Sequence, residues 1–371
     1  MKSDNGPAPK VLLVGDFMWP WYHEACANAL EHHGCVVKRF GWFHAFRYFT
    51  EGKSEPIYHS FFHRIQYRFG LGPLVRRISR ELIDAAAEFQ PDIVWFYNVH
   101  LISPQVVIKL REICSNTVFV QYANDNPFSK SAKQGVWRKY LASIRYFDLH
   151  CVFRYSNIKD YKKMGSRNQA LLRAYFIPEV EYQEPTDTIP DRFKCDVVFA
   201  GHFEKDGRAE MLEAVCNAGF KLNIFGGGWT AALNQLSINS PLRALYPIAP
   251  ATGADYRYAI CGSKVALCFL SKLNQDTYTT RNFQIPAMKV AMLSEYTEDL
   301  AGLFQPNEEA LYFKNEGELV HQIKFLMENE ADRQRIANAG FNRVYTDGHD
   351  VKSRMKNLLK DVYKLMPNKS F

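Results

Sequence analysis

The chain of 371 residues is too long for one ordinary hydrophobic core and is expected to form two domains. Its 47% hydrophobic, 23% charged and 14% aromatic residues exclude a largely disordered or fibrous chain. The formal charge of +7 falls in the first half, because residues 1–185 hold 24 Lys and Arg against 17 Asp and Glu, while residues 186–371 hold 22 of each.

Membrane spans and disulfides are not expected. No run approaches the roughly 20 apolar residues that a span needs, and the first residues are polar, so we expect a cytoplasmic protein. The eight cysteines are scattered without a CxxC pair, which predicts reduced thiols and no zinc site.

In the first half, apolar strands alternate with helices. Strands are expected at residues 11–15, 35–40, 91–98, 117–125 and 148–153, and helices at residues 23–34, 73–89, 104–114 and 156–164. Near-continuous apolar strands between helices are typical of a parallel sheet covered on both faces.

Residues 38–80 interleave seven arginines with many aromatic side chains. This mixture suits an anionic or lipid-bearing surface. In the alternative interpretation, the aromatic side chains form the core and the arginines solvate its rim.

Residues 177–194 are polar, contain three prolines and show no apolar period, so they are expected to be a linker. The alternation then starts again, with strands near residues 195–200, 220–225, 263–271, 289–295 and 310–313 and a helix at 206–218. Helices at 317–345 and 351–365 close the chain. The sequence predicts a second α/β domain on the same plan.

Ligands of parallel sheets collect at the loops beyond the carboxyl ends of the strands. The loop at residues 271–287 places Asn274, Asp276, Thr280 and Arg281 between a strand and a helix expected near Asn282. Free helix amides and an arginine favour a phosphate there. An ordinary helix capped by threonines is the alternative.

Two further loops of the second half are rich in glycine and polar residues. GHFEKDGR supplies Gly201, His202, Lys205 and Arg208 as a second diphosphate contact, and FGGGW supplies Gly226 and Trp229. The Trp229 ring is a candidate for stacking on a nucleobase, with core packing as the alternative. The sequence lacks G-x-G-x-x-G, which disfavours a nicotinamide or flavin enzyme.

The runs TTRNFQIPA, KVAMLSEYTEDLAGLF, NEEALYF and ENEADRQRIANAGFNRVY resemble the C-terminal domain of the CgeB-like glycosyltransferases, a branch of the GT-B superfamily. VVFAGHFEKDGR, NIFGGGW and QYANDNPF are also similar to that group. The resemblance implies an α/β protein with two Rossmann-like domains whose parallel sheets face a central cleft. It further implies a nucleotide-diphosphate-sugar substrate held mainly by the second domain, an acceptor held by the first, and no metal or other cofactor.

The expected organisation is an acceptor-side domain at residues 1–178, a linker at 179–194 and a nucleotide-sugar-binding domain at 195–349. The helix at 350–371 would, as the resemblance implies, return to the first domain. Many retaining GT-B enzymes carry two acids with seven residues between them, and this spacing gives Asp276 and Gln284. Glutamate is usual at the second position, and glutamine keeps hydrogen bonding but loses the charge.

Asp16, His100 and Asp125 each follow an expected strand of the first half and are candidates for the base that takes a proton from the acceptor. The alternatives are a helix cap for Asp16, a structural histidine at His100 and an Asx turn at Asp125. Whether the sugar's configuration is inverted or retained stays open.

The resemblance thus implies a metal-independent hexosyltransferase that moves a sugar to a glycan or lipid-linked acceptor in cell-surface polysaccharide synthesis. It would be cytoplasmic and peripheral to the inner membrane face. A catalytically weak or inactive nucleotide- or glycan-binding module is the alternative, motivated by Gln284. Nucleic acid is not an expected partner, because the basic residues cluster with aromatics and no nucleic-acid-binding motif appears.

Overall fold

The computed structural model describes residues 7–50, 56–129 and 134–366. The chain divides into two compact units. Unit 1 comprises Met1–Arg173 and Val351–Phe371, and unit 2 comprises Ala174–Asp350.

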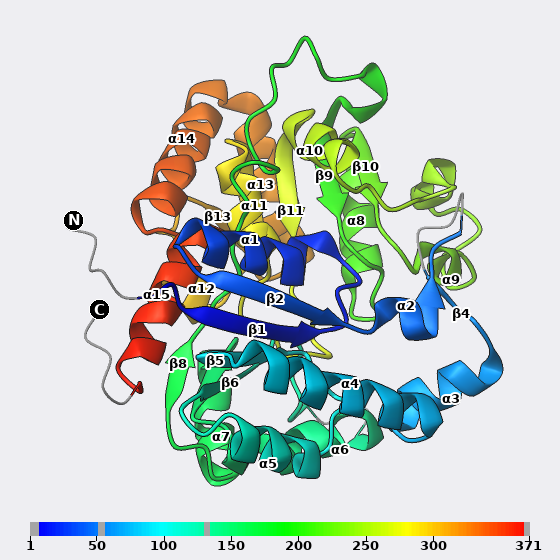
Figure 1. Cartoon of the computed structure of the whole chain (residues 1–371). Helices are drawn as coiled ribbons and strands as arrows, with labels where there is room; N and C mark the ends of the chain where they lie inside the picture. The colour runs from blue at the N-terminus through cyan, green and yellow to red at the C-terminus, as the bar shows by residue number, and fades with distance from the viewer. Residues whose placement is uncertain (1–6, 51–55, 130–133, 367–371) are drawn as a thin grey trace. The chain divides into compact units, whose positions relative to one another are not determined.

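Unit 1 is built on a six-stranded sheet in the order β2-β1-β5-β6-β7-β8, with every neighbouring pair parallel (Figure 1). The strands are β1 (Lys10–Gly15), β2 (Val36–Gly41), β5 (Ile93–Tyr97), β6 (Val118–Ala123), β7 (Leu149–Val152) and β8 (Gln169–Leu171). The residues of β5, β6 and β7 are buried throughout. Burial on both faces explains why these strands read as continuous apolar runs.

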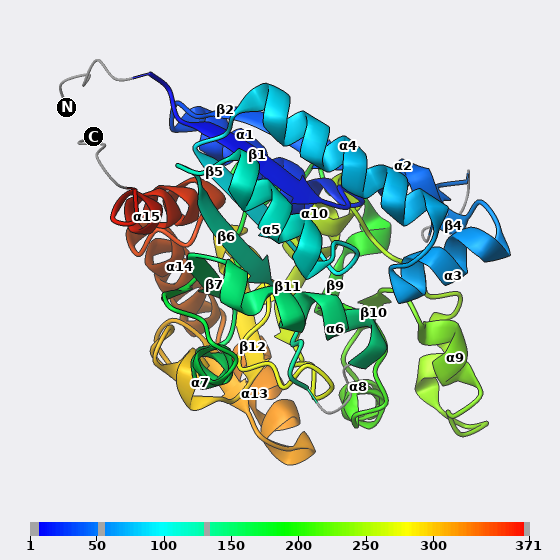
Figure 2. The same cartoon turned by 60° about the horizontal axis from the view of Figure 1, so that its bottom comes forward.

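Helices cover both faces of this sheet (Figure 2). A π-helical turn at Pro20–Glu24 leads into α1 (Ala25–His32), which packs against α15 (Val351–Tyr363). Packed against one another in a second layer are α4 (Pro73–Phe89), α5 (Pro104–Ile113) and α6 (Gln134–Ser143), and α7 (Ile158–Lys163) precedes β8. Between β2 and α4 the chain forms α2 (Phe43–Phe46), the antiparallel pair β3 (Arg47–Tyr48) and β4 (Ile57–Tyr58), and α3 (Phe61–Phe69).

Unit 2 carries a five-stranded, fully parallel sheet in the order β10-β9-β11-β12-β13. Its strands are β9 (Cys195–Ala200), β10 (Leu222–Phe225), β11 (Ser263–Cys268), β12 (Ala291–Glu295) and β13 (Leu311–Phe313). In contact with each other are α8 (Arg208–Asn217) and α13 (Glu316–Glu328), while α11 (Arg281–Ala287) contacts α14 (Glu330–Thr346). The remaining helices are α9 (Trp229–Leu233), α10 (Ala254–Cys261) and α12 (Glu298–Ala301).

The prediction of two Rossmann-like domains with parallel sheets is confirmed. In both units the strand that is second in the chain lies at one edge, next to the first, and the next strand of the parallel sheet lies on the first strand's other side. The expected helix at 317–345 is two helices, since α13 ends at Glu328 and α14 begins at Glu330.

The segment at residues 177–194 packs as part of unit 2. Ile189 and Phe193 are buried, and Glu184 Oε2 lies 2.5 Å from Arg257 Nε. These anchors are spaced without any period, which is why the sequence pattern suggested a polar linker.

Stability should depend on the docking of α15. Met355 is fully buried on this helix, so Met355→Ala is expected to lower the free energy of unfolding by about 2–5 kcal/mol. Chemical denaturation measures the change, and Lys356→Ala, at an exposed position of the same helix, serves as the control. Equal losses in the two variants would contradict the prediction.

Candidate functional site

The loops after β9 and β11 meet because the two strands are neighbours in the sheet, although β10 lies between them in the chain. A Cβ atom placed on Gly201 would lie 3.3 Å from Arg281 Cζ. The loop after β10 joins them at Gly226, whose φ is +158° and where an added Cβ atom would lie 1.9 Å from the carbonyl oxygen of Gly201. Only glycine allows this approach. The structure therefore brings Gly201, Gly226 and Arg281 together at the switch point of the sheet, where ligands bind in such folds.

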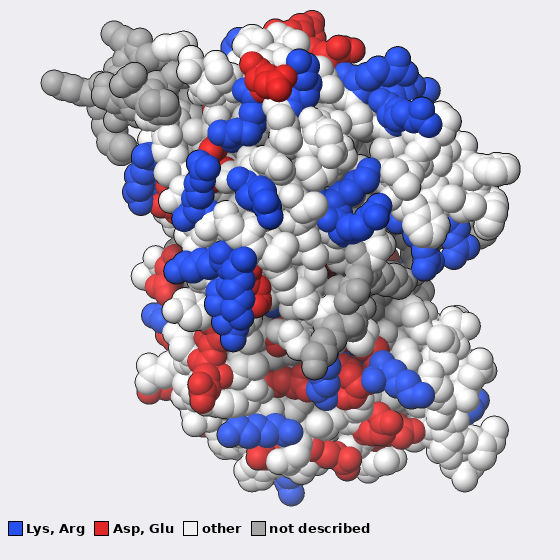
Figure 3. Space-filling model, turned by 90° about the horizontal axis from the view of Figure 1, so that it is seen from below, with Lys and Arg blue, Asp and Glu red and all other residues white. Residues whose placement is uncertain are grey.

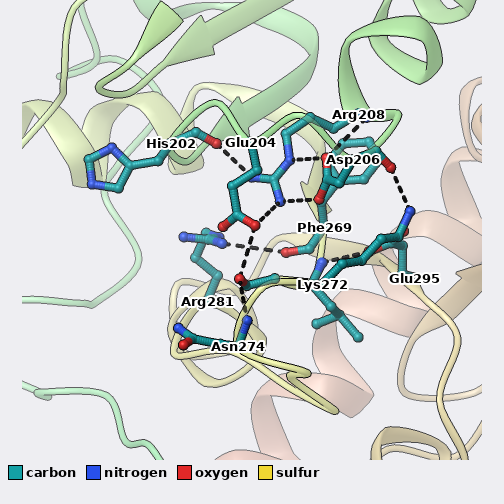
Figure 4. Close-up of polar contacts among 11 residues, drawn as sticks. His202, Glu204, Asp206, Arg208, Phe269, Lys272, Asn274, Arg281 and Glu295 are labelled. Carbon is teal, nitrogen blue, oxygen red and sulfur yellow. Dashed lines mark hydrogen bonds and ion pairs between the residues drawn. The ribbon is translucent and has the colours of Figure 1, made fainter. Parts of the chain in front are cut away.

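Arg208 is enclosed by its own loop (Figure 4). Its Nε and Nη2 donate to the two carboxylate oxygens of Asp206 at 2.8 and 2.6 Å, and its Nη1 donates to the carbonyl of His202 at 2.6 Å. Glu204 Oε2 lies 3.6 Å from Arg208 Nη2. The side chain is 2% exposed, so the structure contradicts its prediction as a direct diphosphate contact. Arg208 instead holds the loop that carries the other candidates.

Arg281 is the opposite case. It begins α11, its guanidinium lies 5.9 Å from the centre of the Phe199 ring, and its Nη2 makes a long contact of 3.5 Å with the carbonyl of Phe269. Its Nε is buried without a hydrogen-bond partner, and no carboxylate among the described residues pairs with it. A guanidinium with unused donors beside glycine loops is suited to an anion.

The loop after β11 is fixed by contacts that the sequence analysis did not predict. Ser271 Oγ donates to Glu204 at 2.9 Å, and Lys272 Nζ donates to the carbonyl of Asp206 at 2.6 Å (Figure 4). The Asn274 amide donates to Ser271 Oγ. Glu295, at the end of β12, accepts the amide of Leu270 at 2.6 Å. The acids of neighbouring loops thus position the segment that holds Asn274 and Asp276.

Three further predicted residues lie on these loops with different environments. His202 is exposed, and its Nδ1 accepts the amide of Gly227. Lys205 is exposed. Trp229 is 1% exposed, packs against Phe203, and donates from its indole nitrogen to the carbonyl of Gly201 at 3.0 Å. Its ring is part of the core, so the prediction that it stacks on a nucleobase is wrong.

The start of α11 differs from the expected threonine cap. Thr280 is the residue before the helix and makes no capping bond with its side chain. The side-chain carbonyl of Asn282 accepts the amide of Thr279 at 2.7 Å instead. The helix has only seven residues, so its dipole is expected to add little to the positive charge of Arg281.

Gln284 is held by two residues from other segments. Its Oε1 accepts a hydrogen bond from Tyr256 Oη at 2.8 Å, and its Nε2 donates to Glu181 Oε1 at 2.9 Å. Glu181 is buried and also accepts the amide of Ile177 at 2.5 Å. Burial raises the pKa of Glu181 to about 7. The sequence analysis missed Glu181 and Tyr256.

In unit 1, Asp16 lies at the corresponding switch point, after β1. Its Oδ1 lies 3.8 Å from His23 Nδ1, and its Oδ2 lies 3.7 Å from Arg47 Nη2. It accepts the amide of Met18 at 3.0 Å, so it shapes the loop and does not cap a helix. Burial lowers the pKa of His23, which leaves Arg47 as the cation beside Asp16.

His100 is linked to Asp16 and Arg47 through Tyr67. The ring centres of Tyr67 and His100 lie 4.9 Å apart. Tyr67 Oη accepts a hydrogen bond from Arg47 Nη2 at 2.7 Å. Burial lowers the pKa of His100 to about 4, and its Nε2 is buried without a partner. A histidine with this pKa is neutral at neutral pH, and its Nε2 is buried, whereas the Asp16 side chain is 23% exposed.

Asp125 lies on the loop after β6. The Asx turn there is formed by Asn126, whose Oδ1 accepts the amide of Phe128 at 3.0 Å, and Asp125 is exposed. Asn98 Nδ2 donates to the side-chain carbonyl of Asn124, and Asn98 Oδ1 accepts the Asn124 amide at 3.2 Å. These bonds tie the loop of Asp125 to the loop of His100.

Within the part of the chain that the structure describes, no group of three or more His, Cys, Asp or Glu is placed to hold a metal ion. None of the described helices is both long and apolar enough to cross a membrane.

Residues 208–360 match the model of a family described as glycosyl transferase-like. No curated protein sequence matches the chain. Among solved structures, the chain is similar to Anabaena Alr3699/HepE in complex with UDP-glucose, with a TM-score of 0.67 and 11% identity over 96% of this chain and 99% of that one.

It is also similar to sucrose-phosphate synthase (tll1590) from Thermosynechococcus elongatus, with a TM-score of 0.65 and 12% identity over 96% of this chain and 100% of that one. It is similar as well to a glycosyltransferase from Rickettsia africae ESF-5, with a TM-score of 0.62 and 10% identity over 98% of this chain and 100% of that one. The chain has the GT-B fold, as predicted.

The pairing of Arg208 can be tested through stability. Asp206→Asn removes the carboxylate that pairs closely with the buried guanidinium and leaves only Glu204, at 3.6 Å. We expect a loss of about 3–5 kcal/mol in the free energy of unfolding. Denaturation in urea measures it, with Lys205→Ala as the control at an exposed neighbour. If Asp206→Asn unfolds like the wild type, Arg208 is not held as described.

Proposed function

We propose that the protein is a glycosyltransferase of the CgeB-like branch that transfers a hexosyl group from a nucleotide-diphosphate-sugar to a glycan or lipid-linked acceptor. The setting that we propose is cell-surface polysaccharide synthesis on the cytoplasmic side of a membrane. The reaction would need no metal, because protein cations would stabilise the departing diphosphate.

The observation that carries this proposal is Arg281. It is a cation without a carboxylate partner among the described residues, and it lies against Gly201 at the switch point of unit 2. Lys205, exposed on the adjoining loop, is the second cation that can reach a phosphate. Paired Arg208 keeps that loop in place.

The comparisons also support a nucleotide-sugar donor. The family model covers the segment that contains Arg281 and Gln284, and the Anabaena protein of the same fold was solved with UDP-glucose and with UDP and glucose. A nucleotide-sugar donor in unit 2 is therefore the ligand class we propose. The donor contacts proposed are His202, Lys205, Asn274, Asp276, Thr280, Arg281 and Gln284, with Gly201 and Gly226 allowing close approach.

For the chemical step we propose Asp16 as the group that accepts a proton from the acceptor hydroxyl. Its carboxylate lies 3.7 Å from Arg47 and is partly exposed, so it is open to solvent. Neutral His100 would bind or orient the acceptor, and Asp125 is a second carboxylate on a neighbouring loop.

The alternative of a weak or inactive binding module is favoured by one observation, which is that both functional ends of Gln284 are already bonded within the protein. Release of UDP from a panel of UDP-sugars, measured with and without acceptor glycans, separates the two. A binder would show affinity without turnover in any combination.

Arg281→Ala is expected to weaken UDP binding by about 1–3 kcal/mol, because a charge-assisted hydrogen bond to phosphate is lost. Calorimetry with UDP measures the change, and GDP, dTDP and CMP serve to identify the base. Arg335→Ala on α14, where Arg335 pairs with Asp332 at the surface, is the matched control. Unchanged affinity in Arg281→Ala would reject Arg281 as the phosphate contact.

A further inference from the structure

Helix α3 presents an apolar face to solvent. No residue of this helix is buried, and Phe61, Phe62 and Phe69 are 69%, 72% and 54% exposed. At the angular spacing of an α-helix, these three and Ile65 fall within an arc of roughly 100°. Leu71, just beyond the helix, is also exposed. So large an exposed apolar row on a folded protein marks an interaction site.

The opposite side of α3 is firmly attached to unit 1. Tyr67 points inward, where it bonds Arg47 and packs against Phe46 at a ring distance of 5.2 Å. Ser60 caps the first turn, and Lys139 Nζ donates to the carbonyls of Gly70 and Leu101 at the other end. The apolar row is therefore held outward by the fold and is not a frayed segment.

The charge along this segment is mainly positive. Residues 61–80 contain five arginines and no Asp or Glu, and all five arginines are exposed. Figure 3 shows Lys and Arg side chains set among uncharged surface, with few acidic ones, on the upper part of the face that it presents. Arg64 and Arg68 lie along one side of the apolar row on the helix itself. The other three, Arg76, Arg77 and Arg80, lie on α4, where Arg77 also pairs with Glu81 at 3.4 Å.

We propose that the α3 surface, made of Phe61, Phe62, Ile65, Phe69 and Leu71 with these five arginines, docks on an anionic lipid membrane. Exposed phenylalanines beside arginines are the pattern of a helix that lies in the interface plane, and each arginine adds attraction to anionic headgroups. A second copy of the chain fits less well, because it would bring five arginines against five. The interpretation of the aromatic side chains as core holds only in part, since Trp42, Phe43 and Phe46 are buried and the α3 phenylalanines are not.

Membrane docking by α3 also bears on the acceptor, and the choice of acceptor class rests on the proposed function. The inward side of α3 ends at Tyr67, beside Arg47 and His100 of the candidate acceptor cluster. A membrane bound to α3 would lie one helix diameter from that cluster. Of the two acceptor classes proposed, the lipid-linked one is the class that this placement favours.

The test is sedimentation of the full chain with vesicles, without nucleotide or acceptor. We expect binding to equimolar phosphatidylcholine and phosphatidylglycerol but not to phosphatidylcholine alone, with a loss of at least about tenfold in affinity for F61S/F62S/F69S and for R64E/R68E. Tyr155→Ser, at an aromatic that is 69% exposed elsewhere in unit 1, should bind like the wild type.

Equal binding by the triple variant and the wild type would overturn the proposal. So would a wild type that does not bind vesicles and instead forms a dimer, seen by light scattering, that the triple variant abolishes. UDP affinity is measured in the same variants. If it is retained while vesicle binding is absent, the membrane proposal fails and the proposed function stands.

A second inference comes from the chain of hydrogen bonds through Gln284. Tyr256 donates to Gln284, Gln284 donates to Glu181, and Glu181 also accepts from Ile177. Every donor meets an acceptor, so an amide at position 284 satisfies both of its neighbours when Glu181 is ionised. A glutamate there would place two carboxylates about 3 Å apart in a buried setting. Their charges would repel each other, so one of the two would have to be protonated.

We infer that Glu181 is a positioning residue that supplies the carboxyl group of this part of the donor site, while Gln284 supplies the amide. The two side chains then act as one exchangeable unit. Swapping them should work, because a glutamine at position 181 can accept from Ile177 and donate to a glutamate at position 284, which can in turn accept from Tyr256. The double variant E181Q/Q284E keeps the charge and reverses only the direction of one bond.

Thermal unfolding and UDP affinity of wild type, E181Q, Q284E and E181Q/Q284E test this inference. Q284E should unfold at a lower temperature than the wild type at about pH 8, with a smaller gap at about pH 5, because the penalty of a second carboxylate appears as pH rises above the ordinary carboxyl pKa. E181Q/Q284E should recover most of the unfolding temperature that Q284E loses.

Effects that simply add in the double variant would overturn the inference. Unfolding requires no nucleotide, so its result stands alone. If Q284E lowers the unfolding temperature and E181Q/Q284E restores it, but neither the wild type nor any variant binds UDP, the exchange of Glu181 and Gln284 is confirmed and the proposed function is wrong.

Discussion

The order of the parallel strands is the constraint on which the candidate sites depend. In unit 2, β9 and β11 are adjacent with β10 at the edge, so the loops that follow the first two meet. In unit 1, β1 and β5 have the same relation, and Asp16 and His100 follow them. Residues about 80 positions apart in the chain, such as Gly201 and Arg281, become neighbours for this reason alone.

Ion pairing then decides the role of each arginine that the strand order brings to this site. Arg208 and Arg281 flank the same loop, yet Arg208 has two carboxylates within 3.6 Å and Arg281 has none among the described residues. A paired, buried arginine fixes structure, because its donors are already used and removing its partner is costly. An arginine with unused donors retains them for a ligand. The two identical side chains thus have different roles.

The sequence predicted the elements whose signal is local. The apolar runs of β9 and β11 marked strands, and the polar loop between β11 and α11 marked Arg281. The predictions that failed concern residues whose roles are decided by partners in other parts of the chain or by side-chain pairing. Trp229 was misread because its burial is decided by Phe203 and the carbonyl of Gly201, and Glu181 was missed because it lies in a segment without periodicity. Arg208 was misread because a side chain's pairing is not visible in spacing.

Arg47 shows how one side chain can link a surface to a chemical site. It donates to Tyr67 on α3, its guanidinium lies 4.4 Å from the centre of that ring, and it lies 3.7 Å from Asp16. A lysine would supply charge but not the planar group that stacks on tyrosine while reaching a carboxylate. Any displacement of α3 would move Tyr67, and with it the cation that faces Asp16. The position of the α3 surface and the electrostatic environment of Asp16 are therefore coupled through one guanidinium.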